Sequence, residues 1–187
     1  IHGSTELIKD LDPEAATRLL DPPIKLMLDA VARYNGTVNH VLGDGVVAIF
    51  GAPTAREDHA VMACLAARAM LEALDAWHGG AIRARIGLHS GEVLFRHVQI
   101  GKSHTSDSVG AAVHIAARLE QTAEPGTACI SAATYALAKG FINARRLSPV
   151  AMKGIDGEVE RFLLLGMNYA ASRWSIRAAR GLSAFTD

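Results

Sequence analysis

A hairpin signal within residues 37–53 constrains the fold more than any other part of this chain. Two runs rich in β-branched and aliphatic residues, 37–42 (TVNHVL) and 46–53 (VVAIFGAP), flank the turn Gly43-Asp44-Gly45. An Asp-Gly pair between two such runs is a strong signal for a tight antiparallel turn. Because both runs are apolar, we expect the hairpin to lie centrally in a sheet and not at a ragged edge.

Helical patterns alternate with this and further strand signals. Asp12 and Pro13 predict a helix start, Asn35-Gly36 predicts its end, and Pro22-Pro23 should kink or divide it. The other predicted elements are amphipathic helices over 56–78 and 109–123, strands on both sides of a turn within 82–98, a polar loop over 99–108, a strand followed by a helix over 126–137, and a terminal hairpin over 148–166.

The order of these elements predicts the fold class. Hairpins favour antiparallel strand pairs, and helical crossovers favour parallel ones, so the sheet should be mixed and mainly antiparallel. We therefore expect an α+β, ferredoxin-like αβ sandwich. The last stretch, 167–187, is basic and follows a complete terminal strand, and we interpret it as a linker toward a following domain.

Composition and charge exclude several classes of protein. The 187 residues carry 19 basic and 19 acidic side chains, so no broad positive surface for nucleic acid or anionic lipid is expected. An RNA-binding ferredoxin-like domain would also need aromatic stacking residues on a basic face, and the pattern lacks them. No apolar run approaches the roughly 18 to 20 residues of a membrane span, so membrane contact is not expected.

The two cysteines predict a reducing environment. Cys64 and Cys129 are far apart, and each stands in an apolar context. This pattern is typical of reduced core residues in a cytoplasmic protein, and neither residue is expected to bind a metal.

Asp44 is the first candidate for chemistry, and two interpretations are open. An Asp-Gly turn needs no function beyond reversing the chain. The glycines on both sides, however, let a ligand approach the backbone closely, so the turn is also suited to presenting a carboxylate.

A second candidate is the Gly3-Ser4-Thr5 run at the start of the chain. Exposed backbone N–H groups and hydroxyls ahead of a helix are suited to binding phosphate oxygens. The alternative is that Ser4 or Thr5 simply caps the helix.

A third candidate is the pair His114 and Arg118, four residues apart on one face of a predicted helix. An arginine with a histidine one turn away is suited to anionic oxygens. The alternative is an ordinary salt bridge between Arg118 and Glu120 or Glu124.

Several of these motifs, taken in order, resemble one known family. The motifs are IHGSTEL (1–7), GTVNHVLGDGVVAIFGAP (36–53), REDHAVMACLAARAM (56–70), RARIGLHSGEVL (83–94), DSVGAAVHIAARLEQTAEPG (107–126), ISAATYAL (130–137) and LSPVAMKGIDGEVERFLLLG (147–166). Together they resemble the class III adenylate/guanylate cyclase catalytic domain. The resemblance covers 1–166, which we expect to be the catalytic domain.

The resemblance implies a reaction and a shared active site. Such domains pair head-to-tail as homodimers, and they convert ATP or GTP to a cyclic nucleotide and pyrophosphate with two Mg²⁺ or Mn²⁺ ions, in signal transduction. Asp44 matches a metal-binding aspartate, and Ile1 matches a residue whose backbone carbonyl binds metal. Gly3, Ser4 and Thr5 match the phosphate loop.

The resemblance also assigns roles on the partner side of the site. Arg118, contributed by the second chain, matches the arginine that stabilises charge on the α-phosphate. His114 stands where the family has a ribose-orienting asparagine. His40 stands at the position of the purine-reading lysine, and Asp107 matches the second purine-reading residue of adenylate cyclases.

Departures from the family pattern leave a second function open. The family's first metal aspartate directly precedes the position of Ile1, so we expect the first strand to be truncated here. The histidines at 40 and 114 change the substrate side, and both would make activity sensitive to pH. The alternative function is a catalytically degenerate regulatory module that dimerises or binds a nucleotide. A further resemblance, to cyclase-like domains of large bacterial signalling proteins, implies a C-terminal ATPase domain after the linker.

Overall fold

The computed structural model describes residues 1–100, 103–152, 154–155 and 157–168. The predicted linker therefore lies outside the described residues from 169 onward. The main sheet has the strand order β3–β6–β10–β7. Its strands are β3 (Arg85–Leu88), β6 (Thr127–Ser131), β10 (Arg161–Met167) and β7 (Ile142–Arg146). β3 and β6 are parallel, whereas β10 is antiparallel to both β6 and β7, so the sheet is mixed.

The predicted hairpin is present as β1 (Thr37–Leu42) and β2 (Gly45–Ile49), with Asp44 in the turn. Among the described residues it forms a two-stranded sheet of its own, so the expected central place in a larger sheet is wrong. The first two residues of the chain lie between this hairpin and the main sheet. The nitrogen of Ile1 donates to the carbonyl oxygen of Asp44 over 2.9 Å, and the N–H of His2 donates to the carbonyl oxygen of Arg83 over 2.7 Å. The chain start therefore joins the turn to the residues that lead into β3.

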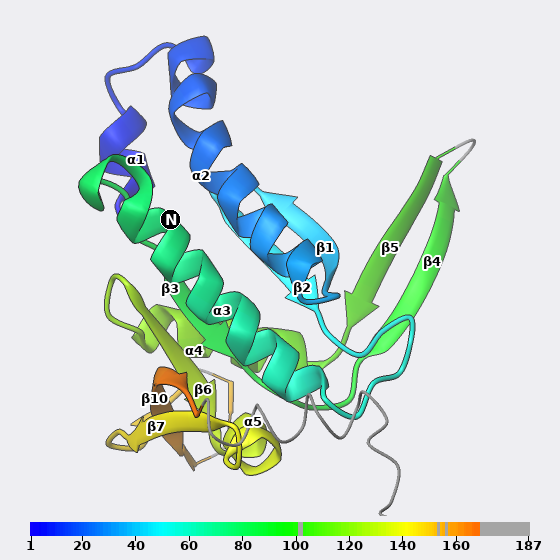
Figure 1. Cartoon of the computed structure of the whole chain (residues 1–187). Helices are drawn as coiled ribbons and strands as arrows, with labels where there is room; N and C mark the ends of the chain where they lie inside the picture. The colour runs from blue at the N-terminus through cyan, green and yellow to red at the C-terminus, as the bar shows by residue number, and fades with distance from the viewer. Residues whose placement is uncertain (101–102, 153, 156, 169–187) are drawn as a thin grey trace, which may run out of the picture.

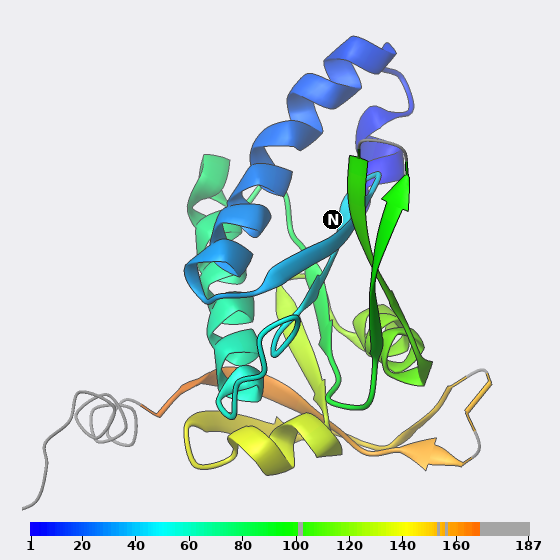
Figure 2. The ribbon, with the colours of Figure 1, turned by 90° about the vertical axis from the view of Figure 1, so that its right-hand side faces the viewer.

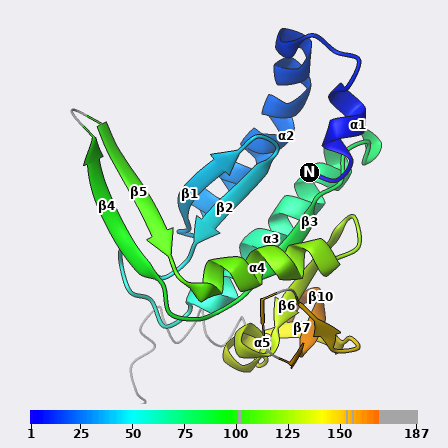
Figure 3. The same ribbon diagram turned by 180° about the vertical axis from the view of Figure 1, so that it is seen from behind.

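Helices cover both sides of the strands (Figures 1 and 3). α2 (Pro13–Arg33) and α3 (His59–Ala76) pack side by side, and a short 3₁₀ turn (Trp77–Gly79) follows α3. α4 (Ala111–Thr122) packs against β3 and β6 from the opposite side. The α+β sandwich predicted from the sequence is confirmed.

Buried apolar side chains hold these layers together. One cluster joins α3 to the main sheet and α5 (Ala132–Ala138), and includes Cys64, Leu71, Ile130, Ile142 and Leu164. A second cluster lies under α4 around Leu119 and Cys129, and a third joins α2 to α3 around Met27 and Leu74. Burying such side chains is the main favourable contribution to folding.

α2 begins and ends where the sequence predicts. The Oδ1 atom of Asp12 accepts a hydrogen bond from the N–H of Ala15 over 2.8 Å, and Pro13 is the first helical residue. Asn35 takes a left-handed φ of 58° just after the helix end. Gly36 is then required, because a Cβ there would lie 2.7 Å from the Phe50 ring.

The prolines at 22 and 23 do not divide α2, so that part of the prediction is wrong. One helix runs through both, although each proline removes a backbone donor. Pro23 is buried, and α2 packs along α3, so tertiary contacts maintain the helix against its local propensity.

The predicted polar loop over 99–108 is also wrong, because most of it forms a strand. β4 (Leu94–Ile100) and β5 (Ser103–Val109) pair antiparallel along their whole length, from Leu94 opposite Val109 to Ile100 opposite Ser103. The hairpin projects from the body as an arm (Figures 1 and 3), and its two strands cross each other in the view of Figure 2. β5 forms a strand because its backbone pairs with β4, and not because its own sequence alternates apolar and polar residues. Its polar sequence therefore gives no signal for a strand.

The remaining elements are short, and β7 was not predicted. β7 has a largely polar sequence, INARR, and becomes a strand by pairing with β10. The terminal hairpin is reduced to β8 (Val150–Ala151) and β9 (Glu158–Val159), ahead of β10. α1 (Ser4–Ile8) begins directly after the chain start.

Both cysteines are buried and form no disulfide, as the sequence predicts. Burial raises the pKa of the Cys64 thiol to about 12, so this thiol stays protonated and unreactive at neutral pH. Every helix in the described part of the chain is too short or too polar to cross a membrane.

Candidate active site

The site is built around the turn between β1 and β2. The strands pair as Thr37–Ile49 and Val38–Ala48, and then shift by one residue, so that His40 lies opposite Val47. This bulge at Asn39 changes which face the following side chains take, because a shift of one residue exchanges the two faces of a strand. The register of the turn itself is set by Leu42 opposite Gly45.

The Asp44 carboxylate lies at the surface of this turn, with 36% of its side chain exposed. Its Oδ2 atom accepts a hydrogen bond of 2.6 Å from the Ser4 hydroxyl and lies 3.3 Å from the amino group of Ile1. Partial burial raises the pKa of Asp44, whereas the hydrogen bond from Ser4 and the other interactions at the turn lower it, and the net direction is downward. The carboxylate is therefore ionised at neutral pH.

The start of the chain supplies the groups beside this carboxylate. Gly3 takes a left-handed φ of 71° and precedes α1 without any side-chain cap. Ser4 is buried with its hydroxyl on Asp44, whereas Thr5 is exposed. The alternative in which Ser4 or Thr5 caps the helix is therefore not what the structure shows.

The two residues expected at the purine lie on neighbouring strands. His40 is half-buried in β1, and Asp107 lies in β5 with its backbone opposite Arg96. β5 packs against β1, so the two positions belong to adjacent elements. The side chain of Asp107 lies outside what the structure describes.

His114 and Arg118 lie on α4, as predicted, with His114 exposed and Arg118 half-buried. Arg118 donates a hydrogen bond of 3.0 Å to the side chain of Gln121 and, within the described residues, forms no salt bridge. Glu120 pairs instead with Arg85 of β3, with 2.8 Å between the guanidinium Nε and the carboxylate. The predicted salt-bridge alternative for Arg118 is therefore not formed.

The chain brings only part of the predicted site together. Ile1, Ser4 and Asp44 are in contact. Across the residues that the structure describes, no hydrogen bond or ion pair joins them to His114 or Arg118.

The residues around Asp44 supply only part of the ligand shell that a divalent ion needs. Among the described residues, no group of three His, Cys, Asp or Glu side chains is placed to hold a metal. Mg²⁺ is nevertheless commonly held by one or two carboxylates, with waters and substrate phosphates completing its shell. An ionised, half-exposed Asp44 beside the Gly3–Thr5 segment fits an ion that arrives with a nucleotide.

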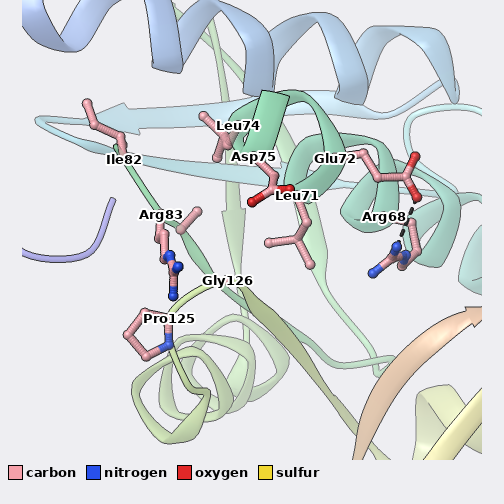
Figure 4. A pocket seen from close by; sticks show the side chains of 10 residues that line it. Arg68, Leu71, Glu72, Leu74, Asp75, Ile82, Arg83, Pro125 and Gly126 are labelled. Carbon is pink, nitrogen blue, oxygen red and sulfur yellow. Dashed lines mark hydrogen bonds and ion pairs between the residues drawn. The ribbon is translucent and has the colours of Figure 1, made fainter. Parts of the chain in front are cut away.

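A pocket of about 350 Å³ lies between α3, the residues before β3 and the loop after α4 (Figure 4). Arg68 and Glu72 form an ion pair of 2.9 Å at its rim, and Arg83 points across it toward Pro125. None of the predicted site residues lines this pocket.

Comparison with known proteins identifies the fold and the family. The sequence model of the Adenylate and Guanylate cyclase catalytic domain matches residues 1–166. The chain belongs to this family. The adenylyl cyclase CyaB from P. aeruginosa is 29% identical, and its structure superposes with a TM-score of 0.79 over 88% of this chain and 89% of that one.

Two further relatives extend the comparison. Adenylate cyclase 1 of Rhizobium meliloti is 28% identical over 176 residues, which cover 89% of this chain and 26% of that protein. The dimeric guanylyl cyclase domain of the RhoGC fusion protein from Blastocladiella emersonii is 25% identical, with a TM-score of 0.80 over 90% of this chain and 93% of that one. The cyclase domain thus spans about a quarter of the length of the curated relatives it matches.

Two contacts of the site were missed by sequence reasoning. The hydroxyl of Ser4 reaches Asp44 across 40 positions, and Arg85 anchors α4 through Glu120. Nothing local in the sequence marks either pair. Gly87 in the IGLHSG motif is a sequence signal that β3 and α4 approach closely. A Cβ at this position would lie 2.1 Å from the carbonyl oxygen of Ala116 in α4.

Proposed function

We propose that this cyclase domain converts ATP to cyclic AMP and pyrophosphate. The observation that supports this most strongly is the Asp44 carboxylate, which is ionised, half-exposed and in contact with the Gly3–Thr5 segment through Ser4.

In the proposed reaction, the ribose 3′-oxygen forms a bond to the α-phosphorus, and the bond from that phosphorus to the leaving pyrophosphate breaks. Mg²⁺ or Mn²⁺, with two ions expected, would supply Lewis acidity toward the phosphate oxygens and the 3′-hydroxyl. Asp44 and the Ile1 carbonyl would hold metal. The Gly3, Ser4 and Thr5 amides would face the phosphates, and His114 would orient the ribose.

We propose that two copies of the chain complete each site. Arg118 carries a positive charge that no salt bridge within the described residues neutralises, and it is not joined to Asp44 within one chain. From a partner chain, this guanidinium would stabilise the charge that develops on the α-phosphate.

We propose ATP as the preferred substrate because of Asp107. A carboxylate accepts a hydrogen bond from an amino group such as that on adenine, and His40 in its neutral form can donate to a ring nitrogen. Adenylate cyclase 1 and CyaB, which are similar to this chain, are both named for the adenylate reaction.

We further propose that residues 167–187 lead to a following ATPase domain.

A regulatory module is the second candidate, and one observation favours it. Asp44 is the only carboxylate in contact with the chain-start segment within the described residues, and a single carboxylate holds two dications poorly. In that case the domain would dimerise or bind a nucleotide without turnover.

Turnover of ATP and of GTP by the full-length protein with Mn²⁺ distinguishes the two candidates. We expect cyclic AMP from the wild type, and a loss of at least 100-fold in Asp44→Asn, roughly the effect of removing one transition-state contact of this kind. The variant should keep its melting temperature, because the exposed turn still forms. A folded wild-type protein without turnover would identify the regulatory module instead.

A further inference from the structure

The contact between Ser4 and Asp44 joins two elements that are remote in the sequence. Ser4 is the first residue of α1, and only 9% of it is exposed. Its hydroxyl donates to the Oδ2 atom of Asp44 over 2.6 Å. Hydrogen bonds from a hydroxyl to a carboxylate are short and stronger than those between neutral groups.

Little else restrains the Asp44 side chain. Gly43 and Gly45 flank it and have no side chains to pack against the carboxylate, and a Cβ at Gly43 would meet nothing within 4 Å. The nitrogen of Ile1 lies 3.3 Å from Oδ2, but in any longer chain that nitrogen belongs to a peptide bond and carries no charge. The Ser4 hydroxyl is the contact that does not depend on a charged chain start.

The two contacts fall on the same carboxylate oxygen. Both the Ser4 hydroxyl and the Ile1 nitrogen approach Oδ2, and neither engages Oδ1. With 36% of the side chain exposed, the carboxylate is held on one side and open on the other. This is the arrangement in which a hydrogen-bonded carboxylate is oriented toward a cation.

We propose that Ser4 is a positioning residue for Asp44: its hydroxyl holds Oδ2 and thereby directs Oδ1 toward a divalent cation. The inference rests on the proposed function, because it takes Asp44 as a metal ligand. It gives the Ser4 side chain a role distinct from binding phosphate, which is left to the backbone amides of the segment.

The test measures the Mn²⁺ affinity of the full-length protein in the presence of an ATP analogue that lacks the 3′-hydroxyl and cannot cyclise, from the Mn²⁺ concentration at which the analogue binds. Removing a residue that orients a metal ligand typically costs 10-fold to 100-fold in affinity, so Ser4→Ala should weaken Mn²⁺ binding by about 10-fold or more. Ser4→Thr keeps a hydroxyl and should restore the affinity to within about threefold of wild type.

Thr17→Ala is the control, because its exposed hydroxyl donates to the carbonyl oxygen of Pro13 within α2 and lies outside the residues proposed to bind metal or phosphate. It should leave Mn²⁺ affinity unchanged. Melting temperatures of all variants are measured in parallel, and the loss in Ser4→Ala should exceed any change that its melting temperature explains.

The outcomes separate this inference from the proposed function. If Asp44→Asn abolishes Mn²⁺ binding while Ser4→Ala binds like wild type, Ser4 has no positioning role and the metal assignment of Asp44 stands. An equal loss in Ser4→Ala and Ser4→Thr would overturn the inference, because the hydroxyl would then not matter. Unchanged binding in Asp44→Asn would overturn both.

Discussion

His89 shows how a single polar residue joins the elements around the site. It follows β3, and its Nδ1 atom lies 2.9 Å from the hydroxyl of Ser131, which caps α5. The same hydroxyl lies 3.2 Å from that of Thr134, which in turn lies 3.0 Å from that of Ser90. Hydrogen bonding of this kind satisfies polar groups that burial would otherwise make costly.

Burial lowers the pKa of His89, so its protonation should destabilise the fold. The contribution of neutral His89 to the free energy of unfolding is complete above the ordinary histidine pKa of about 6.5. It is lost as the pH falls below that value toward the lower pKa that His89 has in the folded protein. We expect the free energy of unfolding, measured in urea, to fall between pH 7.5 and 5.5 more steeply in wild type than in His89→Gln. Equal slopes in the two proteins would contradict this role.

At the residue scale, the sequence predicts in which turn, strand or helix a residue lies better than it predicts which distant residue its side chain contacts. The Gly43-Asp44-Gly45 signal places Asp44 correctly in a tight turn, because turn chemistry is local. Whether its carboxylate is held cannot be predicted in this way, since Ser4 is 40 residues away and the bond depends on the folded sheet. The alternative salt bridge for Arg118 failed for the same reason, because Arg85 of β3 already occupies Glu120.

The packing of α4 against β3 determines the position of Arg118, which lies on α4. A Cβ at Gly87 would lie 2.1 Å from the carbonyl oxygen of Ala116 and 2.3 Å from the nitrogen of Glu120, so strand and helix touch through their backbones. The ion pair between Arg85 and Glu120, both about one third exposed, adds less than about 1 kcal/mol to this contact.

Gly87→Ala should therefore separate α4 from β3. Overpacking of this kind costs about 3 kcal/mol of unfolding free energy, and cyclase activity should fall because Arg118 moves with its helix. Urea unfolding and turnover are the measurements. Gly140→Ala is the control, because a Cβ there meets nothing within 4 Å, and it should change stability by no more than about 0.5 kcal/mol. A Gly87→Ala protein as stable as this control would contradict the packing described here.

Elements with a strong local pattern were predicted, and elements made by pairing were not. α2, α3 and α4 have apolar residues at helical spacing, and each lies where the sequence places it. β5 and β7 are polar in sequence and become strands only because β4 and β10 supply partners. Likewise, α2 continues through Pro22 and Pro23 because packing on α3 outweighs the local signal for a break.

The whole molecule carries exposed apolar side chains near the proposed site. Val41 and Leu42 at the end of β1 are 46% and 66% exposed, and Leu94 at the start of β4 is 61% exposed. Apolar residues exposed on the hairpin and the arm are consistent with a protein interface. Together with the separation of Arg118 from Asp44 in one chain, they support the proposal that the active unit contains two copies.

Mixing two inactive variants tests this account most directly. Full-length Asp44→Asn and Arg118→Ala are each expected to lose cyclase activity. After subunit exchange, a mixed dimer with shared sites has one site with both native residues, so an equal mixture should recover about a quarter of wild-type cyclic AMP production. An equal mixture that exchanges subunits yet stays inactive, beside an active wild type, would contradict a site shared between two chains.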